Sequence, residues 1–239
     1  MEQNTIKSFN SELTEQNKFI ARVYGWMSLA LIITAVVSLG VAISAVNNPA
    51  FFKVLFSKAF YIVLIAEIAL VWFLSARIQK MSVGGAIFGF LLYSVINGVT
   101  ISSIFLIYQI TSIVTLFFVT ALTFGAMSLF GARTKKDVLS WGRYLSMALI
   151  GLIIASFVEL LLVLIFKRPF SLFNLGLSIV GVIIFTLLTA YDTKKIMIVS
   201  EHSDGSDKFK KASILGALEL YLDFINIFLN LLRIFGKRR

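Results

Sequence analysis

The chain has 239 residues, of which 59% are hydrophobic and 14% charged, and it carries a net charge of +10 and no cysteine. Soluble domains hold about 45–50% apolar and about 25% charged residues, so this composition and a mean hydropathy of +0.93 exclude a water-soluble globular protein. The lack of cysteine and the single histidine, His202, exclude disulfides and multi-histidine zinc sites, and the charge implies no nucleic acid, because membrane proteins concentrate Lys and Arg in cytoplasmic loops.

Seven apolar runs bounded by polar residues predict seven transmembrane helices, since about 20 residues cross a bilayer. Continuous runs of this length favour helices over the alternating segments of a barrel. We predict an all-α fold with one membrane domain, residues 23–239, after a polar cytoplasmic segment, residues 1–22, that forms a short interfacial helix. The runs cover residues 23–46, 60–76, 84–108, 113–130, 144–166, 172–192 and the stretch between 211 and 237.

The distribution of basic residues orients these helices. With a cytoplasmic N-terminus, the inner segments hold 14 lysines and arginines and the outer loops hold 4, as the positive-inside rule requires. Arg233 and three basic residues beyond it would lie outside if the last helix spans the membrane fully. Two alternatives therefore remain for the last helix. It either spans the membrane fully, or it is shortened or re-entrant and returns the C-terminus to the cytoplasm.

Five ionisable residues fall inside the predicted spans. Glu67 lies in the second, Glu159 in the fifth, Asp192 at the end of the sixth, and Asp223 and Arg233 in the seventh. A charge inside a span costs several kcal/mol unless it is paired or faces water. Each of the five is therefore a candidate functional residue.

The seventh run carries a polar stripe. Asp223, Asn226, Asn230 and Arg233 are spaced three, four and three residues apart, which places them on one helical face. Glu219 extends this stripe one turn toward the inside. A face of this kind lines either a cavity or the polar interior of a bundle, so we expect the seventh helix to be central.

Residue depth predicts two ion pairs between the second and seventh spans. Glu67 to Arg77 and Asp223 to Arg233 are both ten residues apart, about 15 Å along a helix. In antiparallel helices Arg77 then meets Asp223 near the inner face, and Glu67 meets Arg233 nearer the outer face. Glu159 lies at a depth similar to Glu67 and is an alternative partner for Arg233.

Asp192 and Asp223 flank one inner loop and could approach each other. Two carboxylates in a poorly hydrated site titrate as a coupled pair, and Arg77 would compete with the proton for them. The three residues would form a proton-operated latch. The alternative is that Asp192 caps the end of its helix beside Lys194 and Lys195.

Two segments carry a resemblance to a known family. "LLTAYDTKKI", residues 187–196, and "LYLDFINIFLNLLRIFG", residues 220–236, resemble the closing signature of the Bax inhibitor-1 family, and the short, cysteine-free chain is similar to its bacterial branch. The similarity extends over nearly the whole chain. It implies six helices around a central seventh and an integral, multi-pass protein of the bacterial inner membrane.

The resemblance also implies an activity and its residues. Members of the family are described as pH-sensitive calcium leak channels with a di-aspartyl sensor, which falls here on Asp192 and Asp223. The arginine that engages the sensor falls on Arg77, and a second, gating pair falls on Glu67 and Arg233.

Our leading hypothesis is therefore a cation leak path, for Ca²⁺, along the seventh helix. Asp192 and Asp223 are candidate Ca²⁺ ligands, because this ion prefers oxygen ligands. We expect no enzyme activity and no cofactor, and partners limited to the lipid bilayer, Ca²⁺ and a membrane protein. The alternatives are a non-conducting regulator of membrane proteases or channels and a proton-coupled transporter. The expected path-lining residues are Asn226, Asn230, Glu159 and Glu219.

Overall fold

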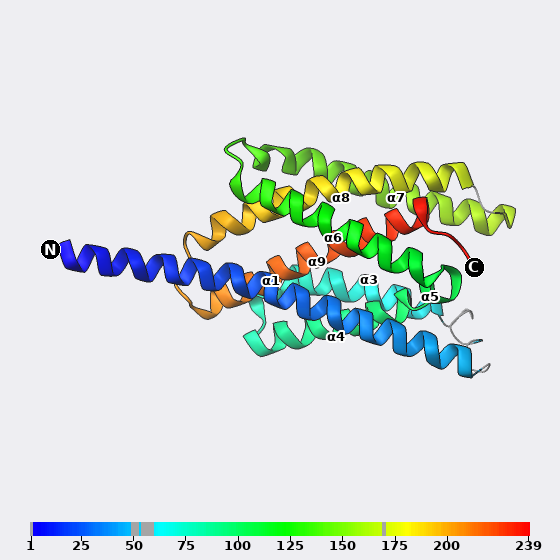
Figure 1. Ribbon diagram of the computed structural model, residues 1–239, viewed down its shortest axis with the longest axis horizontal. Coiled ribbons are helices and arrows are strands. Elements are labelled where there is room, and N and C mark those ends of the chain that lie inside the picture. Colours follow the sequence, from blue (N-terminus) through cyan, green and yellow to red (C-terminus); the bar gives the residue numbers. More distant parts are fainter. Residues whose placement is uncertain (1, 49–52, 54–59, 169–170) are drawn as a thin grey trace. The chain divides into compact units, whose positions relative to one another are not determined.

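The structure, a computed structural model, describes residues 2–48, 53, 60–168 and 171–239 (Figure 1). Within these ranges there is no β-strand, and seven helices are long and apolar enough to cross a membrane. The predicted all-α polytopic membrane fold is therefore confirmed. The main helices are α1 (Glu2–Asn47), α3 (Phe60–Arg77), α4 (Val83–Ile101), α6 (Ile110–Arg133), α7 (Gly142–Phe166), α8 (Ser171–Ser200) and α9 (Asp207–Phe235), with short elements η1 (Ile78–Lys80), α5 (Ile104–Ile107) and η2 (Val138–Trp141) between them.

The N-terminal helix has no break at residue 22. The first polar residues and the first apolar run form one helix, α1, because no proline or glycine occurs before Gly25 to end it. The location of residues 1–22 at the membrane surface stays a prediction, and residue 1 lies outside the described residues.

The third predicted span is interrupted near its end. α4 ends at Ile101 and α5 begins at Ile104. Between them the Ser102 hydroxyl donates to the Val99 carbonyl at 2.6 Å, and the Ser103 hydroxyl donates to the Thr100 carbonyl at 3.3 Å. Serine side chains that bond to nearby backbone compete with helical geometry, which accounts for the break.

α8 extends eight residues beyond Asp192, to Ser200. The residues after Asp192 include no glycine or proline before Gly205, so the helix continues past the apolar run. Asp192 is therefore not at a helix end, and its interpretation as a cap beside Lys194 and Lys195 is wrong.

The last helix crosses without interruption. α9 has 29 residues, about 43 Å at 1.5 Å per residue, and is drawn from orange to red in Figure 1. The backbone N–H of Gln109 donates to the Lys237 carbonyl at 2.9 Å, and the backbone N–H of Lys237 donates to the Ser112 hydroxyl at 3.2 Å. The tail thus meets the start of α6, which favours a full span over a re-entrant helix.

The helices divide into two compact units. The first comprises Met1–Tyr108, Ile196–Tyr221 and Arg239, and the second comprises Gln109–Lys195 and Leu222–Arg238. Both α8 and α9 contribute one segment to each unit.

In the first unit, α1 and α4 lie side by side (Figure 1). Their close approach requires Gly98, because a Cβ there would lie 2.8 Å from Val37 Cβ and 3.0 Å from the Thr34 carbonyl oxygen. Small residues allow helices to approach closely in membranes. The backbone contact brings the polar side chains of the two helices within hydrogen-bonding distance.

In the second unit, α6 packs on α8 through Gly131. A Cβ at this position would lie 2.9 Å from Ala190 Cα, a backbone atom that has no side-chain freedom to move away. On α9, the Phe224 ring packs edge-on against Phe117 and Phe124 of α6, with centroid separations of 5.3 and 5.6 Å. α6 therefore contacts both of the helices that carry the candidate aspartates.

α9 is the most buried span. In its apolar window 67% of the residues are buried, and side chains such as Leu218, Tyr221 and Ile227 are fully covered. This burial agrees with the central position predicted for the seventh helix.

Candidate functional site

Two buried carboxylates, Asp192 of α8 and Asp223 of α9, belong to the second unit. Asp192 is 8% exposed and Asp223 is 3% exposed. Burial of a carboxylate is costly in a membrane protein unless polar groups or ions compensate it. Sequence position alone singled out both residues, and the structure covers both.

The contact between Gly181 and Asn230 sets the register of α8 against α9. A Cβ on Gly181 would lie 2.7 Å from Asn230 Nδ2, so the two positions are at the same depth. Asp192 lies eleven residues after Gly181, and Asp223 lies seven residues before Asn230. In an antiparallel pair the two aspartates are then offset by four residues, about 6 Å along the axis.

Two further sets of contacts agree with this register. In the first unit a Cβ on Gly216 would lie 3.0 Å from Ile196, which places these two residues at one depth as well. On α6, Ser128 lies 3.1 Å from the Thr193 hydroxyl and Phe124 packs on Phe224. Ser128 and Phe124 are one helical turn apart, and their partners directly follow the two aspartates in sequence. Asp192 and Asp223 are therefore about one turn apart along the helix axes.

The segment around Asp192 is held tightly. A Cβ on Gly142, at the start of α7, would lie 2.6 Å from the Tyr191 ring. On the other side of Asp192, the Lys194 ammonium donates to the Thr134 carbonyl at 3.0 Å. The side chains on both sides of the aspartate are therefore packed or hydrogen-bonded to neighbouring elements.

The polar stripe of α9 is only partly buried. Asn230 is 7% exposed, Asn226 and Glu219 are half-buried, and Arg233 is exposed near the end of the helix. The Asn226 amide donates to the Leu222 carbonyl and the Asn230 amide donates to the Asn226 carbonyl, both at 2.8 Å. Both amides therefore bond to their own helix, and a path-lining role for them stays a prediction.

Glu67 of α3 belongs to a hydrogen-bonded cluster in the first unit. Its Oε1 accepts from the Asn97 amide, and its Oε2 accepts from the Thr100 hydroxyl at 2.8 Å. The Tyr221 hydroxyl donates to Asn97 Oδ1 at 2.8 Å and lies 2.6 Å from the Thr34 hydroxyl. An amide and a hydroxyl thus hold both oxygens of the carboxylate.

This cluster, which we call the Glu67 cluster (Thr34, Glu67, Asn97, Thr100 and Tyr221), was not predicted from the sequence. Uncharged polar residues are frequent in membrane helices and do not stand out as a charge does. The available signal was the spacing of Asn97 and Thr100, three residues apart on one face of the third run.

The hydroxyls of the Glu67 cluster have two alternative proton arrangements. Thr34 can donate either to the Ser94 carbonyl, at 2.9 Å, or to Tyr221. A hydroxyl carries one proton, so when Thr34 donates to Ser94, Tyr221 can donate either to Thr34 or to Asn97. The cluster can therefore change its hydrogen bonds without moving a helix.

The predicted pairs of Glu67 with Arg233 and of Arg77 with Asp223 join residues of different units and stay predictions. Arg77 is exposed at the end of α3. Glu159 accepts a 2.7 Å hydrogen bond from the Asn174 amide, and its alternative pairing with Arg233 also stays a prediction.

Among the described residues, no three His, Asp or Glu side chains come together in a way that could hold a metal ion. Asp192 and Asp223 supply carboxylate oxygens, the ligand type that Ca²⁺ prefers. Since Ca²⁺ takes six to eight oxygen ligands, these two carboxylates alone would not complete its coordination.

Comparison with known proteins identifies the family. Residues 16–239 match the family described as "Inhibitor of apoptosis-promoting Bax1". The inner membrane protein YbhL of Escherichia coli is 47% identical over 225 residues, which cover 92% of each chain. An uncharacterized protein of Borreliella burgdorferi is 42% identical, over 95% of each chain, and one of Rickettsia prowazekii is 36% identical, over 98% of this chain and 94% of its own. The chain belongs to the Bax inhibitor-1 family of integral, multi-pass membrane proteins.

Proposed function

We propose that this protein is a pH-sensitive leak path for cations, Ca²⁺ in particular, in a bacterial inner membrane. The observation that carries the proposal is the pair of buried aspartates, Asp192 and Asp223, about one helical turn apart in one unit. Membership in the Bax inhibitor-1 family supports a membrane protein of this class, and the name of the inner membrane protein YbhL supports the location. The N-terminus is proposed to be cytoplasmic, from the positive-inside count.

The aspartates would couple proton binding to ion passage. Two carboxylates in a poorly hydrated place titrate as a pair, so the charge of the pair depends on pH over a range that neither residue sets alone. Arg77 would compensate the ionised pair, and Glu67 with Arg233 would hold the outer half closed. Passage of an ion requires no bond to be made or broken, so the proposal includes neither an enzyme activity nor a cofactor.

The test is calcium flux into liposomes that contain the purified chain and a trapped calcium dye, measured across pH. Asp192→Asn and Asp223→Asn should each abolish the pH dependence, and the double variant should behave like either single one, because the two residues act as one unit. Glu201→Gln, an exposed carboxylate beyond the end of α8, is the matched control and should keep the wild-type profile.

The same assay separates the alternatives. A flux that follows the calcium gradient supports a leak, whereas a flux that requires an opposing proton gradient supports a proton-coupled transporter. Liposomes no more permeable than empty ones at every pH would refute conduction and favour a non-conducting regulator that binds membrane proteases or channels. Wild-type pH profiles in both single variants would remove the aspartates from the sensor.

A further inference from the structure

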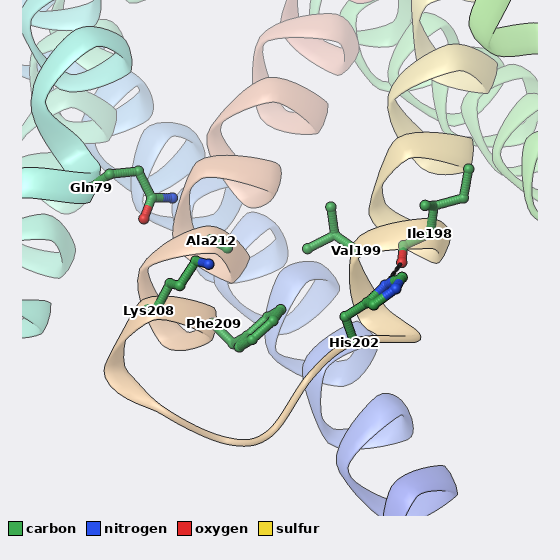
Figure 2. A pocket seen from close by; sticks show the side chains of 7 residues that line it. All are labelled: Gln79, Ile198, Val199, His202, Lys208, Phe209 and Ala212. Atoms are coloured by element: carbon green, nitrogen blue, oxygen red, sulfur yellow. Dashed lines mark hydrogen bonds between the residues drawn. The ribbon is translucent and has the colours of Figure 1, made fainter.

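The first unit contains a cleft between the end of α8, the start of α9 and the turn η1. Its volume is about 310 Å³, within the range of sites for small ligands. Figure 2 shows Phe209 of α9 and Val199 of α8 facing each other across it. The residues that line it are Gln79, Ile198, Val199, His202, Lys208, Phe209 and Ala212.

The cleft combines apolar walls with a position at the ends of the spans. Ile198, Val199, Phe209 and Ala212 are apolar, while η1 directly follows span α3. The loop between α8 and α9 lies on the face that the basic residues predict to be cytoplasmic. At this depth lipid headgroups meet the first methylenes of the acyl chains.

The polar groups of the cleft favour an anion. Lys208 and His202 line it, and none of its seven lining residues is acidic. The Lys208 ammonium lies 5.8 Å from the centre of the Phe209 ring. Lys211 is also close, since it donates to the Gln79 carbonyl at 2.7 Å.

Two neighbouring carboxylates, Asp204 and Asp207, are engaged elsewhere. Asp207 pairs with Lys210 at 2.8 Å, and Asp204 accepts from the Ser206 amide at 2.8 Å. Hydrogen bonds from the side chain and backbone of Ser206 lower the pKa of Asp204. At neutral pH the negative charge of Asp204 is therefore stabilised by hydrogen bonds within its own loop.

His202 has one ring nitrogen for a ligand. Its Nδ1 lies 3.1 Å from the Ile198 carbonyl oxygen, as the dashed line in Figure 2 marks. A carbonyl can only accept, so Nδ1 carries the proton and Nε2 is the atom that can bond a ligand. With the proton on Nδ1, Nε2 of the neutral ring accepts a hydrogen bond.

We propose that this cleft binds one acidic phospholipid of the cytoplasmic leaflet. Its phosphate lies at Lys208, beside His202, and its first methylenes lie on Val199, Phe209 and Ala212. Basic clefts at the cytoplasmic ends of membrane helices are suited to such headgroups. A zwitterionic lipid carries its own cation, which competes with Lys208, and a free inorganic anion gains nothing from the apolar walls.

The test measures lipid binding to the purified full-length chain in an uncharged detergent, by native mass spectrometry. The probes are dioleoyl phosphatidylglycerol, dioleoyl phosphatidylcholine and inorganic phosphate. Lys208→Gln should weaken phosphatidylglycerol binding by about tenfold, the effect of losing one charge-assisted contact. Lys210→Gln is the matched control, because this lysine is on the same helix but pairs with Asp207 and does not line the cleft.

A second variant separates shape from charge. Ala212→Phe keeps every charge and fills the cleft, so it should also reduce phosphatidylglycerol binding, in protein that remains monodisperse. Equal losses in Lys208→Gln and Lys210→Gln would overturn the proposal in favour of diffuse attraction. It would equally be overturned if phosphatidylcholine bound as tightly as phosphatidylglycerol, or if inorganic phosphate alone displaced the lipid.

Discussion

Helices α7 and α9 invert the relation between hydropathy and burial that soluble proteins follow. α7 is the most apolar of the seven spans, yet none of the residues in its apolar window is buried. α9 is the least apolar, and 67% of its window is buried. Lipid solvates an apolar helix face as well as another helix does, whereas polar groups in the bilayer must find partners inside the protein. Polar side chains therefore decide which helix lies inside.

The polar groups of the two helices differ accordingly. α9 places Asp223 and Asn230 in buried positions, and its Tyr221 hydroxyl belongs to the Glu67 cluster. α7 carries one carboxylate in its apolar part, Glu159, which bonds Asn174 of the adjacent α8. Glu159 thus has a partner on the helix next in sequence, whereas the Tyr221 hydroxyl of α9 bonds residues of α1 and α4.

The largest expected effect compares one isoleucine from each helix. Ile227 of α9 is 0% exposed and Ile154 of α7 is 59% exposed. Ile227→Ala should cost about 2 kcal/mol of stability, because the cavity it leaves loses packing contacts even though lipid removes much of the transfer term. Ile154→Ala should cost less than about 0.5 kcal/mol. Unfolding in mixed micelles with increasing denaturing detergent measures both, and equal losses would show that a further partner covers α7.

The sequence was sufficient to predict the number of spans and the burial of Asp192 and Asp223. Run length and composition determine where a helix can cross a membrane, and a carboxylate in a span must be covered. It was insufficient for helix ends beyond the apolar runs. The apolar run does not show that α8 continues past Asp192 to Ser200, because the end of a helix depends on backbone geometry and caps rather than on apolar run length.

Sequence reasoning also matched charge with charge and so overlooked neutral partners. It assigned Glu67 to an arginine, whereas within the first unit its oxygens accept from Asn97 and Thr100. Tyr221 belongs to the motif at residues 220–236, but its hydrogen bonding depends on Thr34, which is 187 residues away in sequence. Such pairings depend on which helices touch, and a single sequence does not contain that information.

An intermediate effect is expected for one tyrosine hydroxyl in each helix. Tyr221→Phe removes the hydroxyl that bonds Asn97 and Thr34 at a fully buried position, which should cost about 1 kcal/mol. Tyr144→Phe, at a position 73% exposed at the start of α7, should leave stability unchanged within about 0.5 kcal/mol. The same micellar unfolding measures both. A neutral Tyr221→Phe would contradict this prediction, because Tyr221 bonds Thr34 or Asn97 in either proton arrangement.

The smallest expected effect concerns one glycine in each helix. Replacing a helical glycine by alanine stabilises the helix by up to about 1 kcal/mol. Gly151→Ala in α7 should therefore raise the melting temperature slightly, because nothing lies within 4 Å of the added Cβ. Gly216→Ala in α9 gains the same preference but places its Cβ 3.0 Å from Ile196 Cγ1 and 3.2 Å from Cδ1. Ile196 is 3% exposed and has little room to move, so the contact should cancel the gain and lower the melting temperature. Since the backbone preference is common to both variants, their difference isolates the contact between α8 and α9. If both variants were stabilised equally, Ile196 would yield freely, and the one-turn separation of Asp192 and Asp223 would lose one of its three supports.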